Sequence, residues 1–396
     1  MNISDRSSSQ NPVRVPASYS KIGQVLLFVG IVLTVVSFVS NLKHAFFGLI
    51  MTLTYVTTIG IGAFFWVGVE YVSSAIWSTP MRRPFEFLAG VIPYLIFLAL
   101  PLLFNIGTVF EWAHRGAFKS DPSMLLRAPY LNVPFFVVRA VIVFAVWLLF
   151  YFLVIRNSKL QDKSRDQNLT TKNIRLSAAF MPIFALTITV FAIDWLMSLV
   201  PDWFSTIFGV YLFAGSAVAS MAFATLLIVL LNEKNNFPVK LTPDHYYNLG
   251  ALLFAFLNFW AYIGFSQFML QWYGNLREET LWFIPRIHGS WAIVSIVLVL
   301  FQFIVPFFAL ITRDSKMNPK RLVFMSIWLL VAHAIDIYWM VMPVYNTSSA
   351  TFGWSEIAFP VLSVGIILTV FGLKGRKNNL VPVGDPKLKR GLEFHI

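Results

Sequence analysis

The sequence contains no cysteine. The chain therefore forms no disulfide, ligates no iron–sulfur cluster through Cys and attaches no haem through a C-x-x-C-H motif. Charged residues are also scarce, at 12% of 396, whereas a typical soluble domain carries about 25%. So few charges cannot cover the surface of a water-soluble globule of this length.

The signatures of several enzyme classes are missing as well. The chain has no H-E-x-x-H, P-loop, G-x-S-x-G or dinucleotide-binding pattern in a βαβ context. The Gly60 and Gly62 pair lies inside a hydrophobic run, where small residues permit close helix packing. Of the six histidines, only His288 and His333 could lie at similar depth on two helices, so a b-type cytochrome is not expected.

Long apolar runs are abundant. Hydrophobic residues make up 58% of the chain, with 40 Phe and 13 Trp, and the mean hydropathy is +0.72. A helix needs about 20 mostly apolar residues to cross a bilayer. Ten segments meet this condition: 21–41, 50–77, 86–108, 130–155, 174–199, 206–231, 246–273, 288–311, 319–342 and 356–373. The sequence therefore predicts an all-α integral membrane protein with ten transmembrane helices.

The basic residues predict how these helices are oriented. With the N-terminus inside, 23 of the 30 Lys and Arg fall in cytoplasmic segments and 6 in outer loops, as the positive-inside rule requires. This distribution argues against nucleic-acid binding despite a net charge of +12. We expect a cytoplasmic tail at 1–20, a ten-helix domain at 21–373 and a second cytoplasmic tail at 374–396. The outer loops at 109–129 and 274–287 are long enough to dock a partner.

Ionisable side chains inside the membrane are candidate functional residues, because each costs roughly 2.5–3.5 kcal/mol to insert. The candidates within the predicted helices are Arg139, Asp194, His333, Asp336 and Glu356. His333 and Asp336 are three residues apart and share one helix face. An imidazole beside a carboxylate can hold or pass a proton at moderate pH.

Structural interpretations of these residues stay open. Arg139 could instead neutralise Asp194 or Asp336 and hold helices together. Glu356 lies close enough to an interface to be solvated, and so do two other ionisable groups near helix ends, His288 and Glu70.

The helix at 246–273 also carries a polar face with Tyr262, Ser266 and Gln267. These side chains are candidate contacts for a quinone or a proton. Ordinary hydrogen bonds between helices are the alternative interpretation.

Several stretches of the chain resemble one known family. The matching stretches are Phe64–Trp66, Arg82–Arg83, Glu86–Leu88, Asp194–Leu199, Trp203–Tyr211, His245–Leu249, Phe259–Tyr262, Phe265–Gln267, Trp272–Tyr273, Glu278–Thr280, His333, Asp336, Tyr338–Trp339 and Pro343. They resemble the F subunit of bacterial alternative complex III, one of the NrfD-like, polysulfide-reductase-type membrane proteins.

The resemblance implies ten helices in two four-helix bundles with two peripheral helices. It also implies a subunit, not catalytic alone, of a quinol:cytochrome c oxidoreductase in a respiratory or photosynthetic chain of a bacterial inner membrane. The implied partners are a related NrfD-like subunit, a c-type cytochrome and iron–sulfur subunits, and these partners would carry the haem c and the clusters. This chain would bind no covalent cofactor, with a quinone contact left open.

By the same resemblance, Asp194, His333 and Asp336 are expected to form a proton path, with Arg139 and Glu356 as neighbours. One departure from the family is Gln302, where many relatives have His. Because Gln exchanges no proton at neutral pH, a relay through the helix at 288–311 is not expected.

A secondary transporter is the alternative function. The intramembrane charges would then bind a substrate or a coupling ion. Transporters are often built from internal repeats and discontinuous helices. Proline interrupts several predicted helices here, but the chain shows no internal repeat.

Overall fold

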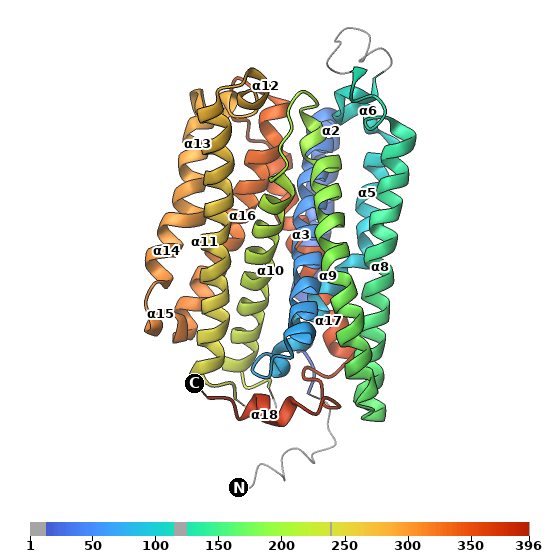
Figure 1. The fold of residues 1–396 in the computed structure, drawn as a ribbon, viewed down its shortest axis with the longest axis vertical. Helices are drawn as coiled ribbons and strands as arrows, with labels where there is room; N and C mark the ends of the chain where they lie inside the picture. Colours follow the sequence, from blue (N-terminus) through green and yellow to red (C-terminus); the bar gives the residue numbers. More distant parts are fainter. Residues whose placement is uncertain (1–12, 115–124, 238–239, 396) are drawn as a thin grey trace.

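The computed structural model describes residues 13–114, 125–237 and 240–395, and within these ranges the chain is helical with no strand. Ten helical spans are long and apolar enough to cross a membrane, so the predicted count is confirmed. Figure 1 shows these spans standing side by side. The chain is a multi-pass membrane protein.

The first five spans are built from nine helical elements. Their bounds are α2 (Ala17–Ser40), α3 (Leu42–Ser73), η1 (Thr79–Met81), α4 (Arg82–Leu88), η2 (Ala89–Tyr94), α5 (Leu95–Phe104), α8 (Val133–Ser164), α9 (Asn168–Trp195) and η5 (Met197–Leu199). Two short elements, α6 (Ile106–Val109) and η3 (Glu111–Ala113), follow the third span.

The other five spans are built from seven elements. Their bounds are α10 (Phe208–Glu233), α11 (Pro243–Gly274), α13 (Gly289–Val299), the π-helical turn η7 (Leu300–Ile304), α14 (Val305–Leu310), α16 (Pro319–Tyr345) and α17 (Trp354–Lys377). Short elements connect them or follow them: α12 (Arg277–Thr280), η6 (Ile284–Ile287), α15 (Arg313–Met317) and α18 (Leu388–Leu392).

Local sequence signals explain where several spans begin. The side chains of Asn41, Asn132 and Asn318 accept hydrogen bonds from the first turns of α3, α8 and α16. Such caps satisfy backbone N–H groups that have no partner within the helix. Proline in the first turn of α8, α11 and α16 fits there because its missing N–H is not needed.

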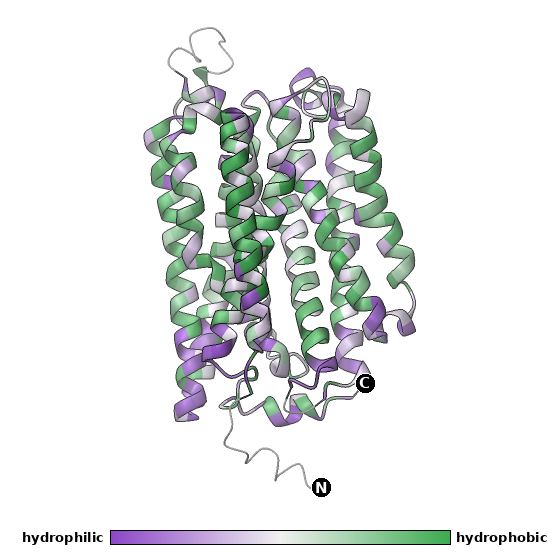
Figure 2. Ribbon diagram, turned by 180° about the vertical axis from the view of Figure 1, so that it is seen from behind, coloured by the Kyte–Doolittle hydropathy of each residue, from purple (hydrophilic) through white to green (hydrophobic). Residues whose placement is uncertain are grey.

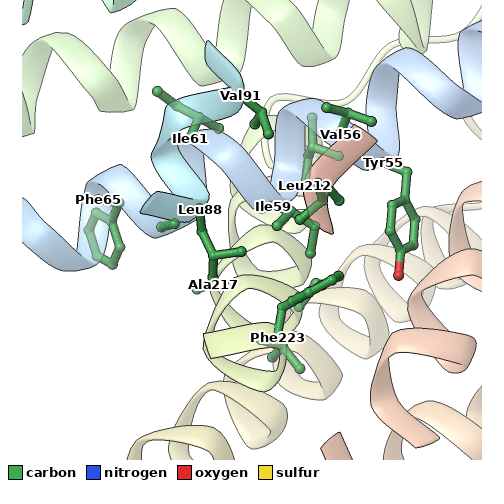
Figure 3. Packing of buried hydrophobic residues seen from close by; sticks show 14 of the residues in the cluster. Tyr55, Val56, Ile59, Ile61, Phe65, Leu88, Val91, Leu212, Ala217 and Phe223 are labelled. Carbon is green, nitrogen blue, oxygen red and sulfur yellow. The ribbon is translucent and has the colours of Figure 1, made fainter. Parts of the chain in front are cut away.

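The helices α3 and α10 lie at the centre and pack against one another. The most apolar stretch of α3 is buried throughout. Figure 3 shows buried side chains of α3 with Leu212, Ala217 and Phe223 of α10 and Leu88 and Val91 of the third span, which all belong to one hydrophobic cluster. In Figure 2 the hydrophobic colour covers the middle of the spans, and polar residues gather toward the end where the termini lie.

The two ends of the described chain lie at the same end of the bundle, which we call the terminal end (Figure 1). There the Leu380 N–H donates to the Val13 carbonyl at 2.8 Å. The other end, which carries α6 and α12, is the distal end. The segment after α17 is not a free tail, because Leu380, Val381 and Asp385 are buried against the bundle. Residues 1–12 of the predicted N-terminal tail lie outside the described residues, and so do 115–124 of the loop that was expected to dock a partner.

Four predicted boundaries are wrong by six residues or more. The α3 helix begins at Leu42 rather than at 50, directly after its cap Asn41. The third span begins at Thr79 rather than at 86, so Arg82 and Arg83 lie in a helix and not in a loop. The α8 helix continues to Ser164 and α9 begins at Asn168. The polar residues 156–175 therefore extend two helices instead of forming a long connection, because Lys, Arg and Gln are good helix formers although they lower the hydropathy.

Glycines allow the backbones of α2 and α17 to touch. A Cβ on Gly23 would lie 2.3 Å from the backbone nitrogen of Thr369, and a Cβ on Gly365 would lie 2.4 Å from that of Leu27. Gly30 and Gly372 repeat this contact seven residues further along each helix. Packing through small residues is a common way to hold helices together in a membrane, where lipid removes the hydrophobic driving force.

We predict that Gly365→Ala destabilises the protein, because the added methyl group forces the two helices apart at a cost of about 1–3 kcal/mol. Alanine returns about 1 kcal/mol as a better helix former, which leaves a net loss of up to about 2 kcal/mol. The thermal unfolding of the purified chain in detergent measures the effect. Gly107→Ala is the control, since a Cβ there meets nothing closer than 3.8 Å. Equal unfolding temperatures for the two variants would contradict the packing argument.

Candidate functional site

The centre of the candidate site is Asp336 on α16, which is 1% exposed. Its Oδ1 accepts a hydrogen bond from the Tyr211 hydroxyl of α10 at 2.5 Å, and its Oδ2 accepts one from the Trp260 indole of α11 at 3.2 Å. Both donors are neutral. Three helices thus converge on one carboxyl group.

His333 lies one turn away from Asp336, near the midpoint of α16, and is fully buried. Its Nε2 lies 2.9 Å from the hydroxyl of Thr58, which also donates to the Tyr55 carbonyl at 2.9 Å. A hydroxyl has one proton, so Thr58 accepts from His333 when it donates to Tyr55. The hydrogen bonds therefore assign the ring proton to Nε2.

The second ring nitrogen of His333, Nδ1, has no hydrogen-bond partner. It faces Gly215 of α10, as does Oδ2 of Asp336. Each of these two atoms lies 3.6 Å from the position that a Cβ on residue 215 would take. Because position 215 is glycine, an unprotonated imidazole nitrogen and a carboxylate oxygen border the same small space.

The structure confirms that His333 and Asp336 share one face of α16. They do not bond to one another, because Thr58 holds the imidazole and Tyr211 holds the carboxyl group. We call these four residues, with Trp260, the His333–Asp336 site.

Asp336 differs from the other buried carboxylates. Glu70, Glu86, Asp194, Glu356 and Asp385 each have an Arg or His nitrogen within 4 Å. Within the part of the chain that the structure describes, Asp336 has no basic side chain at that distance. An ionised carboxylate without such a partner is costly to bury.

A fixed positive charge lies beyond Tyr211. Arg286 is 2% exposed, and its guanidinium donates to the carbonyls of Trp282, Trp339 and Met340. It also stacks on the Trp282 ring, 3.6 Å from the centroid. Burial lowers the pKa of Arg286, while the neighbouring Tyr211 raises it. An arginine starts from so high a pKa that it stays charged.

Arg139 and Asp194 form a separate pair near the distal end. Arg139 donates to both carboxylate oxygens at 2.9 Å, and Tyr130 donates its hydroxyl to the same carboxylate. Burial raises the pKa of Tyr130 and Asp194 raises it further, so the phenol remains a donor. This geometry fits the structural interpretation of Arg139, with Asp194 and not Asp336 as its partner. No contact joins the pair to the His333–Asp336 site.

Glu356 begins α17 and accepts from His44 at 2.8 Å and from the backbone of Gly353 at 2.7 Å. It is 6% exposed, so the expectation that it is solvated is wrong. His288 is exposed, as that interpretation requires.

Glu70 is also buried, against expectation, because it belongs to an ion-pair cluster at the terminal end. Arg82 contacts Glu70, Glu86 and Asp385, and Arg83 contacts Glu86 and Asp162. We call these six residues the arginine cluster. It joins α3, α4, α8 and the segment after α17. The α3 face between Glu70 and Thr58 carries Gly62 and Trp66, which pack on α10, so the cluster is separate from the His333–Asp336 site.

The three candidates on α11 do not converge. Tyr262 is 65% exposed on the outer surface and Ser266 is partly exposed. Gln267 lies on the buried face, where its Oε1 has no partner. The prediction of one polar face is wrong, because five residues of helix turn Tyr262 and Gln267 in different directions. No single quinone headgroup could contact both side chains.

Gln302 lies in the π-helical turn η7 and is fully buried, and both polar atoms of its amide lack a hydrogen-bond partner. The amide is therefore not hydrogen-bonded to the His333–Asp336 site. π-Helical turns within α-helices are frequently found at functional sites.

The sequence alone assigns no role to five residues that surround the predicted site residues: Tyr211, Trp260, Thr58, Arg286 and His44. Arg286 follows Pro285 in a stretch that the sequence predicts as an outer loop. Its burial was therefore not expected. The others are uncharged or lie near a helix end. Only the fold, which brings together residues up to 312 positions apart, identifies them.

No group of three or more His, Asp or Glu within residues 13–114, 125–237 and 240–395 is placed to hold a metal ion. No protein-family model matches the chain, and no curated protein matches it.

We predict that Arg139→Gln lowers the free energy of unfolding by about 3–5 kcal/mol, because Asp194 is left buried without its cation. The double variant Arg139→Met/Asp194→Leu should recover most of this loss, since it removes both charges. Thermal unfolding in detergent compares the three proteins. If the double variant were as unstable as the single one, the ion pair would not be the cause.

Proposed function

We propose that this chain is a cofactor-free membrane subunit that holds and passes a proton at Asp336 within a quinol-oxidising complex. The observation that carries the proposal is the buried carboxyl group with no basic partner. Every other buried carboxylate of the described residues has such a partner, so the exception has no evident structural purpose. Ionisable groups of this kind in membrane proteins commonly mark proton routes.

The chemistry follows from the hydrogen bonds. Asp336 is most easily buried as the neutral acid, which Tyr211 and Trp260 stabilise through one hydrogen bond each. When the proton leaves, the same two donors stabilise the carboxylate. Nδ1 of His333 borders the same space and is free to accept the proton.

The wider assignment rests on the resemblance to alternative complex III. That resemblance supports a place beside a related NrfD-like subunit, a c-type cytochrome and iron–sulfur subunits in a bacterial inner membrane, with both termini cytoplasmic. Electrons would then pass through the haem c and the clusters of those partners. This chain would contribute scaffold and the proton site, and the exposed Tyr262 gives no support for a quinone site on α11.

A secondary transporter is the second candidate, and one observation favours it. The third span is interrupted by η2, and the eighth is interrupted by η7 beside the unpartnered Gln302. Discontinuous helices near the midplane often bind substrate in transporters. We rank this function second, because Gln302 is not hydrogen-bonded to the buried carboxyl group.

Native purification separates the two functions. We predict that the chain, extracted in mild detergent, copurifies with subunits that contain haem c and iron–sulfur clusters. Absorption spectra and mass spectrometry of the purified assembly measure this. A stable, haem-free homo-oligomer that takes up a substrate into liposomes would overturn the proposal.

Within the purified complex, we predict that Asp336→Asn lowers quinol-oxidation turnover by roughly 100-fold, since the amide cannot carry the proton. Asp336→Glu should keep part of the activity because it keeps an acid. Asp314→Asn, at an exposed position on α15, is the matched control. Full turnover and unchanged proton release in the Asn variant would leave Asp336 with a purely structural role.

A further inference from the structure

A groove of about 300 Å³ lies between α8 and α17 at the terminal end of the bundle. Its lining combines two kinds of residue. Four are basic: Arg156, Lys159, Lys163 and Lys374. The others are apolar or aromatic, and they include Phe152, Ile155 and Leu160. The groove shares no residue with the His333–Asp336 site.

The helical extension of α8 creates this arrangement. Arg156, Lys159 and Lys163 follow one another at intervals of three and four residues, so they line one face of α8. Lys374 reaches the groove from α17, where its side chain crosses Gly90 at 3.3 Å from the position of a Cβ. The four cations are thus carried by two helices, α8 and α17, rather than by a loop.

The protein does not neutralise these cations. None of the four has a carboxylate within 4 Å among residues 13–114, 125–237 and 240–395. Asp162, the nearest acid along α8 on the inner side, is paired with Arg83 instead. Four like charges around one groove repel one another, and an anionic ligand would relieve that repulsion.

The apolar wall shows which anion fits. Phe152 is 55% exposed and Leu160 is 42% exposed on the outer surface of α8. In a spanning helix, exposed apolar side chains contact lipid tails. A ligand that meets both the cations and this wall needs a negative headgroup joined to acyl chains.

We propose that the groove binds an anionic phospholipid, with its phosphate between Lys159 and Lys374 and an acyl chain along Phe152. Basic pockets between transmembrane helices bind such headgroups in other membrane proteins. A free phosphate ion would use the cations but not the wall. The bound lipid would link α8 to α17 and so join the two sides of the arginine cluster.

Native mass spectrometry of the detergent-purified full chain tests this proposal. Phosphatidylglycerol should remain bound where phosphatidylcholine does not, and millimolar inorganic phosphate should not displace it. Lys159→Gln/Lys374→Gln should lower the affinity for phosphatidylglycerol roughly tenfold or more. The matched control, Lys234→Gln/Lys320→Gln, removes two exposed lysines from the same end and should bind as the unaltered chain does.

Two further variants keep the result interpretable. Lys159→Arg/Lys374→Arg keeps both charges and should retain binding, which would assign the loss in the Gln variant to the missing charges, provided that the Gln variant unfolds at the same temperature as the unaltered chain. Phe152→Ala should weaken the binding of long-chain phosphatidylglycerol more than that of a short-chain analogue. Equal losses in the groove variant and its control, or displacement by inorganic phosphate alone, would overturn the proposal.

Discussion

A charge inside a membrane bundle needs a partner, and this requirement explains most of the polar architecture. Water cannot solvate these groups, so an isolated ion would cost several kcal/mol. Polar contacts accordingly join helices at the ends of the bundle: the ion pair of Arg139 with Asp194 joins α8 to α9, and the hydrogen bond between His44 and Glu356 joins α3 to α17. The arginine cluster joins α3, α4, α8 and the C-terminal segment. Together with the glycine contacts of α2 and α17, these pairs fix which helices are neighbours.

Against this background Asp336 is the exception. It lies close to the middle of α16, where solvation by water is least available, and its donors are the neutral side chains Tyr211 and Trp260. Such an environment favours the protonated acid but supplies hydrogen bonds to the anion as well. His333 adds a ring nitrogen without a hydrogen-bond partner beside the carboxyl group, which is the arrangement that the proposed proton site requires. A purely structural residue at this position would be easier to accommodate as a hydrophobic side chain.

The sequence predicted those features that depend on local composition. Ten spans follow from runs of apolar residues, and the shared face of His333 and Asp336 follows from their spacing. The C-terminal end of α8 and the start of the third span were predicted wrongly. A hydropathy scale does not distinguish charged residues that are buried or that extend a helix from charged residues in a loop. Glu86 lies on the same helix as Arg82 and Arg83, but their other partners, Glu70, Asp162 and Asp385, lie on other segments and no local pattern connects them. Tyr211 and Asp336 are 125 residues apart, and no local pattern connects them.

The geometry and the family resemblance support different parts of the proposed function. The geometry identifies a protonatable site inside the bundle, and the resemblance suggests the redox complex that would use it. The central claim is that Asp336 changes its protonation state during turnover. Infrared difference spectroscopy of the purified complex, reduced and then reoxidised, tests it most directly. We predict a carboxylic-acid C=O band that changes with the redox state, is lost in Asp336→Asn and persists in Asp314→Asn. A band that persists in Asp336→Asn, or its absence from the unaltered complex, would contradict the claim.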